Sequence, residues 1–386
     1  MAEDFQEIAH SGGKITITVV DDEEGRRNYQ VGIRSARPNP MAMISVFALP
    51  QGLIVEPMKM GGMGDTTPPP SIPGCFPVYI MSDSEGHFGH NCPRCAGYWR
   101  SGPWANVCPY CGLHLPAHEF ISLAQRRYVR QYCEKMEKAL MNDEADVYEI
   151  DMDAVADAAG KDGEKPAFYV SEQSQQSKFT CAACEEFNDI IGRYGYCSCC
   201  GTRNDIEDFT SAIVCIRDKL NNKEAPDVCL REAVSTFDSF VAQYARQLAG
   251  MVPMTKGRKN RLKEQSFHGF EDARKVFSEW FDIDIAAGFK QGELVFVKTK
   301  FFRRHVFEHS GGQVTQRYLD DSGDTTVKLN ELLREKQEDV HTLLGFLSRL
   351  ARNLHDGFHE LFPPNEAPIK QFEEKKARMA AYCKSR

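Results

Sequence analysis

Short runs of β-branched and other apolar residues occur through the first 57 residues, separated by Asp, Asn and Pro. Residues 15–20 (ITITVV), 28–33 and 43–49 are such runs, and runs of this length bounded by turn residues are typical of strands. We therefore predict a β-rich N-terminal domain over residues 1–57. The Gly- and Pro-rich residues 58–74 that follow are typical of a linker.

Later segments repeat apolar residues at helical spacing. Residues 120–141 place them four or five apart, and the stripes that begin at Leu230 and Leu333 place them mostly three or four apart. The last stripe stops at Pro363-Pro364, because proline cannot continue a helix. Residues 143–164 hold nine acidic residues and one lysine, which we interpret as a solvated connector. The pattern thus predicts a helix with an acidic connector over 119–175, a helical domain over 209–365 and a charged C-terminal tail over 366–386.

The composition is that of a globular protein with more than one core. Of 386 residues, 42% are hydrophobic and 26% charged, which excludes global disorder. No apolar run reaches the roughly 18–20 residues of a membrane span, and the acidic start lacks the apolar region of a secretory signal. We therefore expect a cytoplasmic protein without a membrane partner. The net charge of −8 argues against coating nucleic acid by charge alone.

The 14 cysteines contain two clusters with one spacing. Without a secretory signal, such cysteines favour metal binding over disulfides. Each cluster reads C-x2-C-x12-C-x2-C-G, and each C-x2-C can aim two thiolates at one ion, so two of them complete a tetrahedral zinc site. Four protein ligands close the coordination sphere, which predicts two structural zinc ions per chain and no catalytic metal. The predicted ligands are Cys92, Cys95, Cys108 and Cys111 in the first cluster, and Cys181, Cys184, Cys197 and Cys200 in the second.

Both clusters resemble zinc ribbons, over residues 75–118 and 176–208. Trp99 and Arg100 follow the first knuckle, and an aromatic beside an arginine can stack on unpaired bases. These side chains are equally suited to packing on a neighbouring domain, because a ribbon has almost no core of its own. His87 and His90 precede the first knuckle, but four thiolates already suffice for zinc.

A basic run follows Pro253. Arg258, Lys259, Arg261 and Lys263 lie within six residues, and such a cluster suits contacts with a phosphate backbone. A plain solvated loop is the alternative.

The segment RRHVFEH, residues 303–309, concentrates reactive side chains on a predicted helix that Gly311-Gly312 can end. His305 and His309 are one turn apart and share a face. Arg304 and His309 are five residues apart, about 140° around a helix. They therefore do not share a face in one copy, and a second subunit could bring them together.

This segment resembles the HEPN family, whose members include metal-independent ribonucleases. Besides the Arg-x4-His motif, the chain has Gly311-Gly312, Tyr318-Leu319 and Gly323-Asp324 in the order of one HEPN subgroup. The resemblance covers about residues 228–362 and implies a helical bundle that pairs with a second copy. It also implies an endoribonuclease acting in defence or stress response. In that family pattern Arg304 would contact the scissile phosphate, His309 would act as general acid or base, and His305 would orient the others.

Three alternatives remain open for the helical domain. HEPN domains without catalysis exist, and such a domain would bind or sense RNA or protein. Residues His305 to His309 also match H-x-x-E-H, a zinc-peptidase motif in which Glu308 would activate water. That chemistry needs a third ligand, for which Glu331, Glu335 and Glu338 are available. A second, looser pair is Arg352 and His359, which we interpret as two residues on one face of an amphipathic helix.

Together these patterns predict a multidomain α+β protein: a β-rich N-terminal domain, two zinc ribbons and a C-terminal HEPN-like helical bundle. We expect RNA as the main partner, a homodimer or higher oligomer, and a protein regulator as a further possibility.

Overall fold

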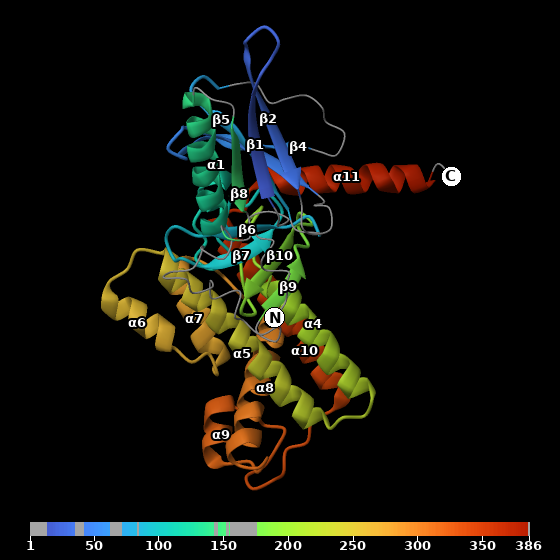
Figure 1. Ribbon diagram of the computed structural model, residues 1–386. Helices are drawn as coiled ribbons and strands as arrows, with labels where there is room; N and C mark the ends of the chain where they lie inside the picture. The colour runs from blue at the N-terminus through green and yellow to red at the C-terminus, as the bar shows by residue number, and fades with distance from the viewer. Residues whose placement is uncertain are drawn as a thin grey trace. The chain divides into compact units, whose positions relative to one another are not determined.

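The computed structural model describes residues 14–34, 42–61, 72–82, 85–142, 146–151, 154 and 176–384 (Figure 1). The chain forms two compact units. The first unit comprises residues 1–203 and 365–386, and the helical unit comprises residues 204–364. The helical unit is therefore an insertion between two segments of the first unit, and the protein is a mixed α/β protein with small sheets.

Two antiparallel sheets of three strands form the N-terminal part of the first unit. One has the order β2-β1-β8, and the other has the order β4-β3-β5. The strands are β1 (Lys14–Asp21), β2 (Arg27–Arg34), β3 (Met43–Ala48), β4 (Ile54–Gly61), β5 (Phe76–Met81) and β8 (Val147–Asp151).

The predicted solvated connector is wrong for part of its length. Strand β8 lies within it and pairs with β1, placing Ile150 opposite Ile15, and both side chains are buried. Residues 155–175 of the connector lie outside the described residues. Strand β4 also runs to Gly61, into the segment predicted as a linker, of which residues 62–71 lie outside the described residues.

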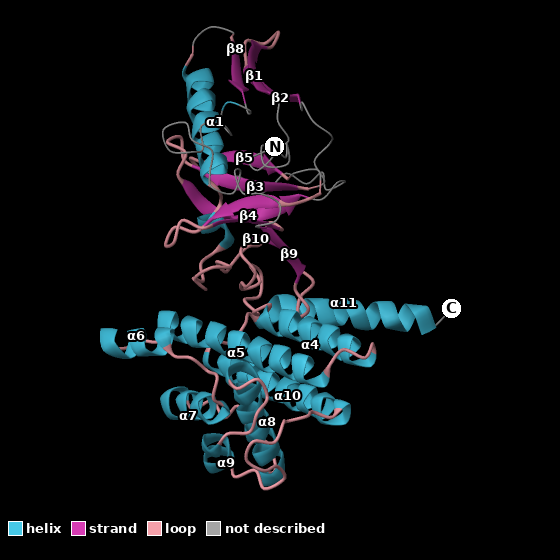
Figure 2. Cartoon of the chain, turned by 90° about the horizontal axis from the view of Figure 1, so that it is seen from below, coloured by secondary structure: helices cyan, strands magenta, loops and turns pink. Residues whose placement is uncertain are grey.

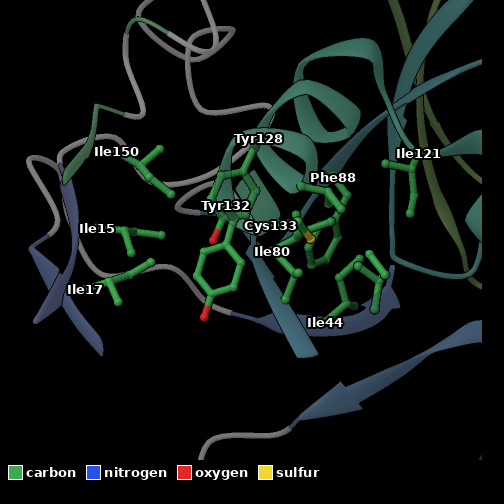
Figure 3. Close-up of a cluster of buried hydrophobic side chains, with 14 of the residues drawn as sticks. Ile15, Ile17, Ile44, Ile80, Phe88, Ile121, Tyr128, Tyr132, Cys133 and Ile150 are labelled. Carbon is green, nitrogen blue, oxygen red and sulfur yellow. The ribbon is translucent and has the colours of Figure 1, made fainter. Parts of the chain in front are cut away.

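Helix α1 (Leu123–Met141) supplies the core that both sheets share, as predicted for residues 120–141. It begins with a capping box, in which Ser122 and Gln125 each bond the other's backbone amide. Its buried face includes Tyr128, Tyr132 and Cys133, which pack with Ile15 and Ile17 of β1 and with Ile44 and Ile80 of β3 and β5 (Figure 3). Alternation along β1 puts its isoleucines on this one face.

The helical unit consists of packed helices, as its apolar stripes predict (Figure 2). Its elements are α4 (Asp205–Asn221), α5 (Pro226–Met251), α6 (Lys256–Glu264), α7 (Phe270–Phe281), α8 (Gln291–His309), α9 (Gln316–Ser322) and α10 (Gln337–Leu361). The stripe of α10 is buried from Val340 to Phe358. Leu333 does not belong to that helix: it is buried in the preceding loop against Val306 of α8.

The predicted charged tail is a helix, α11 (Glu366–Lys384), and it belongs to the first unit. Ile369 packs against the second cysteine cluster. The Asn365 amide donates to the Cys200 carbonyl at 2.7 Å, and the Lys375 ammonium lies 2.8 Å from the Glu185 carboxylate. These contacts hold the second segment of the first unit against this cluster. No helix among the described residues combines the length and apolar character of a membrane span.

Candidate functional site

The eight predicted cysteine ligands form two groups of four. The Sγ atoms of Cys92 and Cys111 lie 3.7 Å apart and those of Cys95 and Cys108 lie 3.6 Å apart. The corresponding distances in the second cluster are 3.6 Å for Cys181–Cys200 and 3.5 Å for Cys184–Cys197. A tetrahedral zinc with Zn–S bonds of about 2.3 Å separates its sulfurs by about 3.8 Å. Both groups therefore fit structural zinc, and the thiolates of the four knuckles would hold the ions.

All four knuckles close with the same backbone turn. The residue four positions after the first cysteine has a left-handed φ: 57° at Ala96, 63° at Gly112, 64° at Glu185 and 82° at Gly201. Its amide donates to the carbonyl of that first cysteine in each case, at 2.8–3.0 Å. The sequence marks only the two glycines. A left-handed φ is normally unfavourable for a residue with a Cβ, yet Ala96 and Glu185 both adopt it. The geometry that the cysteine ligands require therefore outweighs the backbone preference of these two residues.

The two clusters share one sheet. Strands β6 (Phe88–Asn91), β7 (Tyr98–Ser101), β10 (Phe187–Ile191) and β9 (Gln176–Thr180) follow one another in that order. Strand β7 of the first cluster pairs with β10 of the second, placing Arg100 opposite Asp189. Their charged groups lie 3.0 Å apart, and the side chains are 4% and 0% exposed. The two ribbons therefore form one fused body, which the sequence does not reveal.

Trp99 and Arg100 cannot contact nucleic acid as predicted. Trp99 is fully buried, and its ring packs against Phe120 and His90. Arg100 is committed to the buried pair with Asp189. Both residues hold the fused ribbons together, so the packing alternative is correct and base stacking at these two positions is wrong.

The histidines near the first knuckle are packing residues. His90 is buried, its Nε2 lies 3.0 Å from the Gly102 carbonyl oxygen, and burial lowers its pKa to about 4. The His87 ring stacks on Phe187 with centroids 3.9 Å apart. Among the described residues, the metal-binding group at this knuckle contains only the four cysteines.

Helix α8 carries the second candidate site at its C-terminal end. The helix ends at His309, and Gly311 and Gly312 both have a left-handed φ, as predicted. The rings of His305 and His309 have centroids 4.4 Å apart, and both side chains are exposed. Arg304 is half-buried, and its Nε has no hydrogen-bond partner among the described residues.

Basic side chains lie near His305. Partial desolvation lowers the pKa of His305, and the nearby His309, Arg317, Arg304 and His268 lower it further. At neutral pH His305 is therefore uncharged and can accept a hydrogen bond. Two of these neighbours are paired with acids, Arg317 with Asp321 at 3.4 Å and His268 with Asp238 at 3.1 Å.

A buried ionic network holds this end of α8, and the sequence analysis missed it. Arg303 lies 2.8 Å from Asp324 and 3.1 Å from Glu335. Lys300 contacts Glu335 as well, and the Tyr318 hydroxyl donates to Asp324 at 2.6 Å. Burial alone would lower the pKa of Arg303, but its bonds to the two carboxylates raise it. Tyr318 and Asp324 thus hold Arg303 in place.

One signal could have revealed this network. Lys300 follows the buried Val297 by three residues and is itself only 3% exposed. A lysine on the apolar face of a predicted helix requires a buried acid as its partner. Because the acid comes 35 residues later, the sequence alone does not say which one it is.

Replacing Glu335 with glutamine should destabilise the helical unit by about 3 kcal/mol, because two buried cations lose a shared carboxylate. Hydrogen exchange measured on peptides from residues 291–309 would detect the faster opening of α8. Glu360→Gln, an exposed change on α10, is the matched control and should leave exchange unchanged. Equal protection in the two variants would contradict the structural role of the network.

Among the described residues, no acidic side chain completes the zinc-peptidase alternative as a third ligand. No metal-binding group among the described residues includes His305 or His309. Glu335, one of the acids proposed as a third ligand, instead forms ion pairs with Lys300 and Arg303.

The second Arg–His pair lies on α10. Arg352 is exposed and His359 half-buried. The Nδ1 atom of His359 lies 3.1 Å from the carbonyl oxygen of Phe362, beyond the helix end. His355, one turn earlier, bonds the Tyr244 hydroxyl at 2.7 Å. These contacts fit the interpretation that His359 is an ordinary residue at a helix end.

The basic run forms helix α6, not a loop. Only Leu262 of this helix is buried, and Arg258, Lys259, Arg261 and Lys263 take part in no ion pair among the described residues. Arg258 lies over the Trp280 ring, 5.1 Å from its centroid. The helix therefore presents an uncompensated basic surface.

The structure thus supports two groups of four cysteines that fit metal ions and a pair of exposed histidines at the end of α8. No family model, curated protein or solved structure matches the chain.

Proposed function

We propose that the chain is a metal-independent endoribonuclease whose site consists of Arg304, His305 and His309. The observation that carries this proposal is the exposed imidazole pair at the end of α8, with centroids 4.4 Å apart, next to Arg304, whose Nε has no hydrogen-bond partner among the described residues. A phosphodiester is a substrate that such a site suits, because a histidine can take up or give a proton near neutral pH and an arginine binds phosphate. The resemblance to HEPN domains gives the same assignment.

The reaction would use the substrate's own 2′-hydroxyl as nucleophile. His309 takes the proton of that hydroxyl, and the 2′-oxygen forms a bond to phosphorus. The bond from phosphorus to the 5′-oxygen breaks, and the leaving oxygen takes a proton from the protonated His309 of a second copy. Arg304 stabilises the charge on the phosphoryl oxygens through its planar donor fork. His305, uncharged at neutral pH, accepts a hydrogen bond and orients the neighbouring groups.

A second copy of the chain would complete this site. Arg304 and His309 are about 140° apart around α8, so one copy directs them to different sides. Pairing two copies would place one Arg304 near the other His309, and the two histidines could then serve as base and acid. The zinc sites take no part in the chemistry, because four cysteines leave no open coordination position.

The products distinguish this chemistry from metal-dependent hydrolysis. Purified protein should still cleave single-stranded RNA during a brief treatment with a chelator, and it should leave DNA of the same sequence intact. Mass spectrometry of the products should show 2′,3′-cyclic phosphates. Cleavage of both nucleic acids, or products with 3′-hydroxyl ends, would contradict the proposal. RNA binding without cleavage by the monomer and by the dimer would favour a non-catalytic binding module.

Helix α6 is the surface that we propose for the RNA backbone. Replacing Arg258, Lys259, Arg261 and Lys263 with alanine should weaken RNA binding, and it should flatten the slope of log affinity against log salt by about 0.7 for each lost contact. Titration of labelled RNA into the His309→Ala protein at several salt concentrations would measure this.

A change of equal charge on α11 is the control. Replacing Lys370, Lys375, Lys376 and Arg378 with alanine removes four cations from another exposed helix. The salt dependence should stay unchanged in that variant, and an equal loss in both would mean that only net charge matters.

A further inference from the structure

A cleft opens beside His305 in the helical unit. It has a volume of about 710 Å³ and is lined by residues of α7, α8 and α9 and of the loops that precede α7 and α9. Its wall includes His305 but neither Arg304 nor His309. A cleft of this volume holds a small molecule or one unit of a polymer, and the two-stranded helix of a nucleic acid is far too wide for it.

Aromatic side chains line part of the cleft. Phe270 and Tyr318 are buried, while Phe302 is half-buried. The Tyr318 hydroxyl is bonded to Asp324, so its ring is held in place. Rigid aromatic walls of this kind bind flat, apolar groups by stacking.

Charged residues of both signs line the same cleft: the basic residues His268, Lys298 and Arg317, and the acids Glu271, Asp272 and Asp321. Arg317 is paired with Asp321 at 3.4 Å and His268 with Asp238 at 3.1 Å. Lys298 differs, because no ion pair among the described residues includes it. Its ammonium lies 5.7 Å from the centroid of the Phe302 ring. The cleft therefore brings aromatic side chains together with a lysine that forms no ion pair among the described residues.

We propose that this cleft binds one unstacked nucleotide of a single-stranded RNA, with the base against Phe302 and a phosphate beside Lys298. The inference rests on the proposed function, since His305 borders the cleft and would face the bond next to the bound nucleotide. A base that must leave its stack to enter makes cleavage specific for unpaired strands, because opening a duplex costs stacking and pairing energy.

Binding of mononucleotides to the His309→Ala protein tests the cleft without any cleavage. Adenosine 5′-monophosphate and uridine 5′-monophosphate should bind, and ribose 5-phosphate, which lacks a base, should bind at least 5-fold more weakly. Phe302→Leu keeps an apolar side chain at the half-buried position. It should weaken nucleotide binding about 5- to 100-fold, since stacking on one base contributes about 1–3 kcal/mol, and should leave ribose 5-phosphate unaffected.

Lys298→Gln should weaken the binding of both the mononucleotides and ribose 5-phosphate, because it removes the charge beside the phosphate. Lys275→Gln is the matched control, since Lys275 lies on α7 and is paired with Glu279 on the surface. It should leave the binding of both ligands unchanged. Equal binding of nucleotide and ribose 5-phosphate, or no effect of Phe302→Leu, would overturn the base site.

The cleavage assay separates this inference from the proposed function. Wild-type protein should cleave a single strand and spare the same sequence in a duplex. Equal cleavage of both would overturn the inference while leaving the ribonuclease intact. Nucleotide binding with Phe302 dependence in a protein that cleaves no RNA would overturn the ribonuclease while leaving the cleft as a nucleotide site.

Discussion

Replacing Cys197 with serine should leave one zinc ion per chain instead of two, and should unfold the second ribbon. The Cys197 sulfur is fully buried in its cluster, and it also accepts a hydrogen bond from the Asn188 side chain at 3.7 Å. Structural zinc contributes about 10–16 kcal/mol of apparent binding free energy in small zinc modules, which is as large as the whole stability of a typical domain, about 5–15 kcal/mol. Elemental analysis of purified protein would measure the zinc content.

The neighbouring cysteine provides a close control. Cys199 is also nearly buried but lies outside the group of four, so Cys199→Ser should retain both ions. Loss of the second ion should also loosen α11, because Ile369 packs on this cluster and Asn365 bonds Cys200. Faster hydrogen exchange in residues 366–384 would report that release. Two ions in Cys197→Ser, or none in folded wild-type protein, would contradict the zinc assignment.

Replacing His309 with alanine should lower RNA cleavage about 10²- to 10⁴-fold, the usual loss when a general acid or base is removed. The side chain is exposed at the end of α8, so the fold and the zinc content should be unchanged. Single-turnover cleavage of labelled RNA gives the rate.

The control for this change is His341→Ala, which removes a half-buried histidine of α10 and should leave cleavage unaffected. Full activity in His309→Ala would mean that another residue serves as acid or base, even if the chain is a ribonuclease.

The local features of the fold could be predicted from the sequence. The helices α1, α5 and α10 follow from apolar stripes several turns long, and both cysteine clusters follow from a spacing that occurs twice. The position at which α8 ends could be predicted from Gly311 and Gly312. Each of these signals lies within a few neighbouring residues, where periodicity and turn chemistry act directly.

The pairing of distant segments could not be predicted. Arg100 and Asp189 are 89 residues apart, and no local sequence pattern indicates that β7 and β10 share a sheet. The prediction that Trp99 and Arg100 stack on bases was wrong for the same reason. An aromatic residue beside an arginine gives the same sequence pattern whether the two side chains are exposed or buried. Strand β8 was missed because Ile150 is its one fully buried residue amid acidic neighbours.

The candidate site was predictable in part. The pairing of His305 and His309 follows from their spacing of one turn, and the ring distance agrees. The network of Lys300, Arg303 and Glu335 was not predicted, because the acid that pairs with Lys300 comes 35 residues later and no local pattern identifies it. The cleft beside His305 depends on α7 and α9, whose positions relative to α8 are set by packing.

RNA cleavage by the wild-type protein beside an Arg304→Ala, His309→Ala double variant is the most direct test of the central claim. Both proteins would be purified as dimers with two zinc ions and incubated with single-stranded RNA during a brief chelator treatment. Wild-type protein should cleave the RNA, and the double variant should show no cleavage above background. Equal cleavage by the two proteins, or none by the wild type, would contradict the assignment of this site as a ribonuclease.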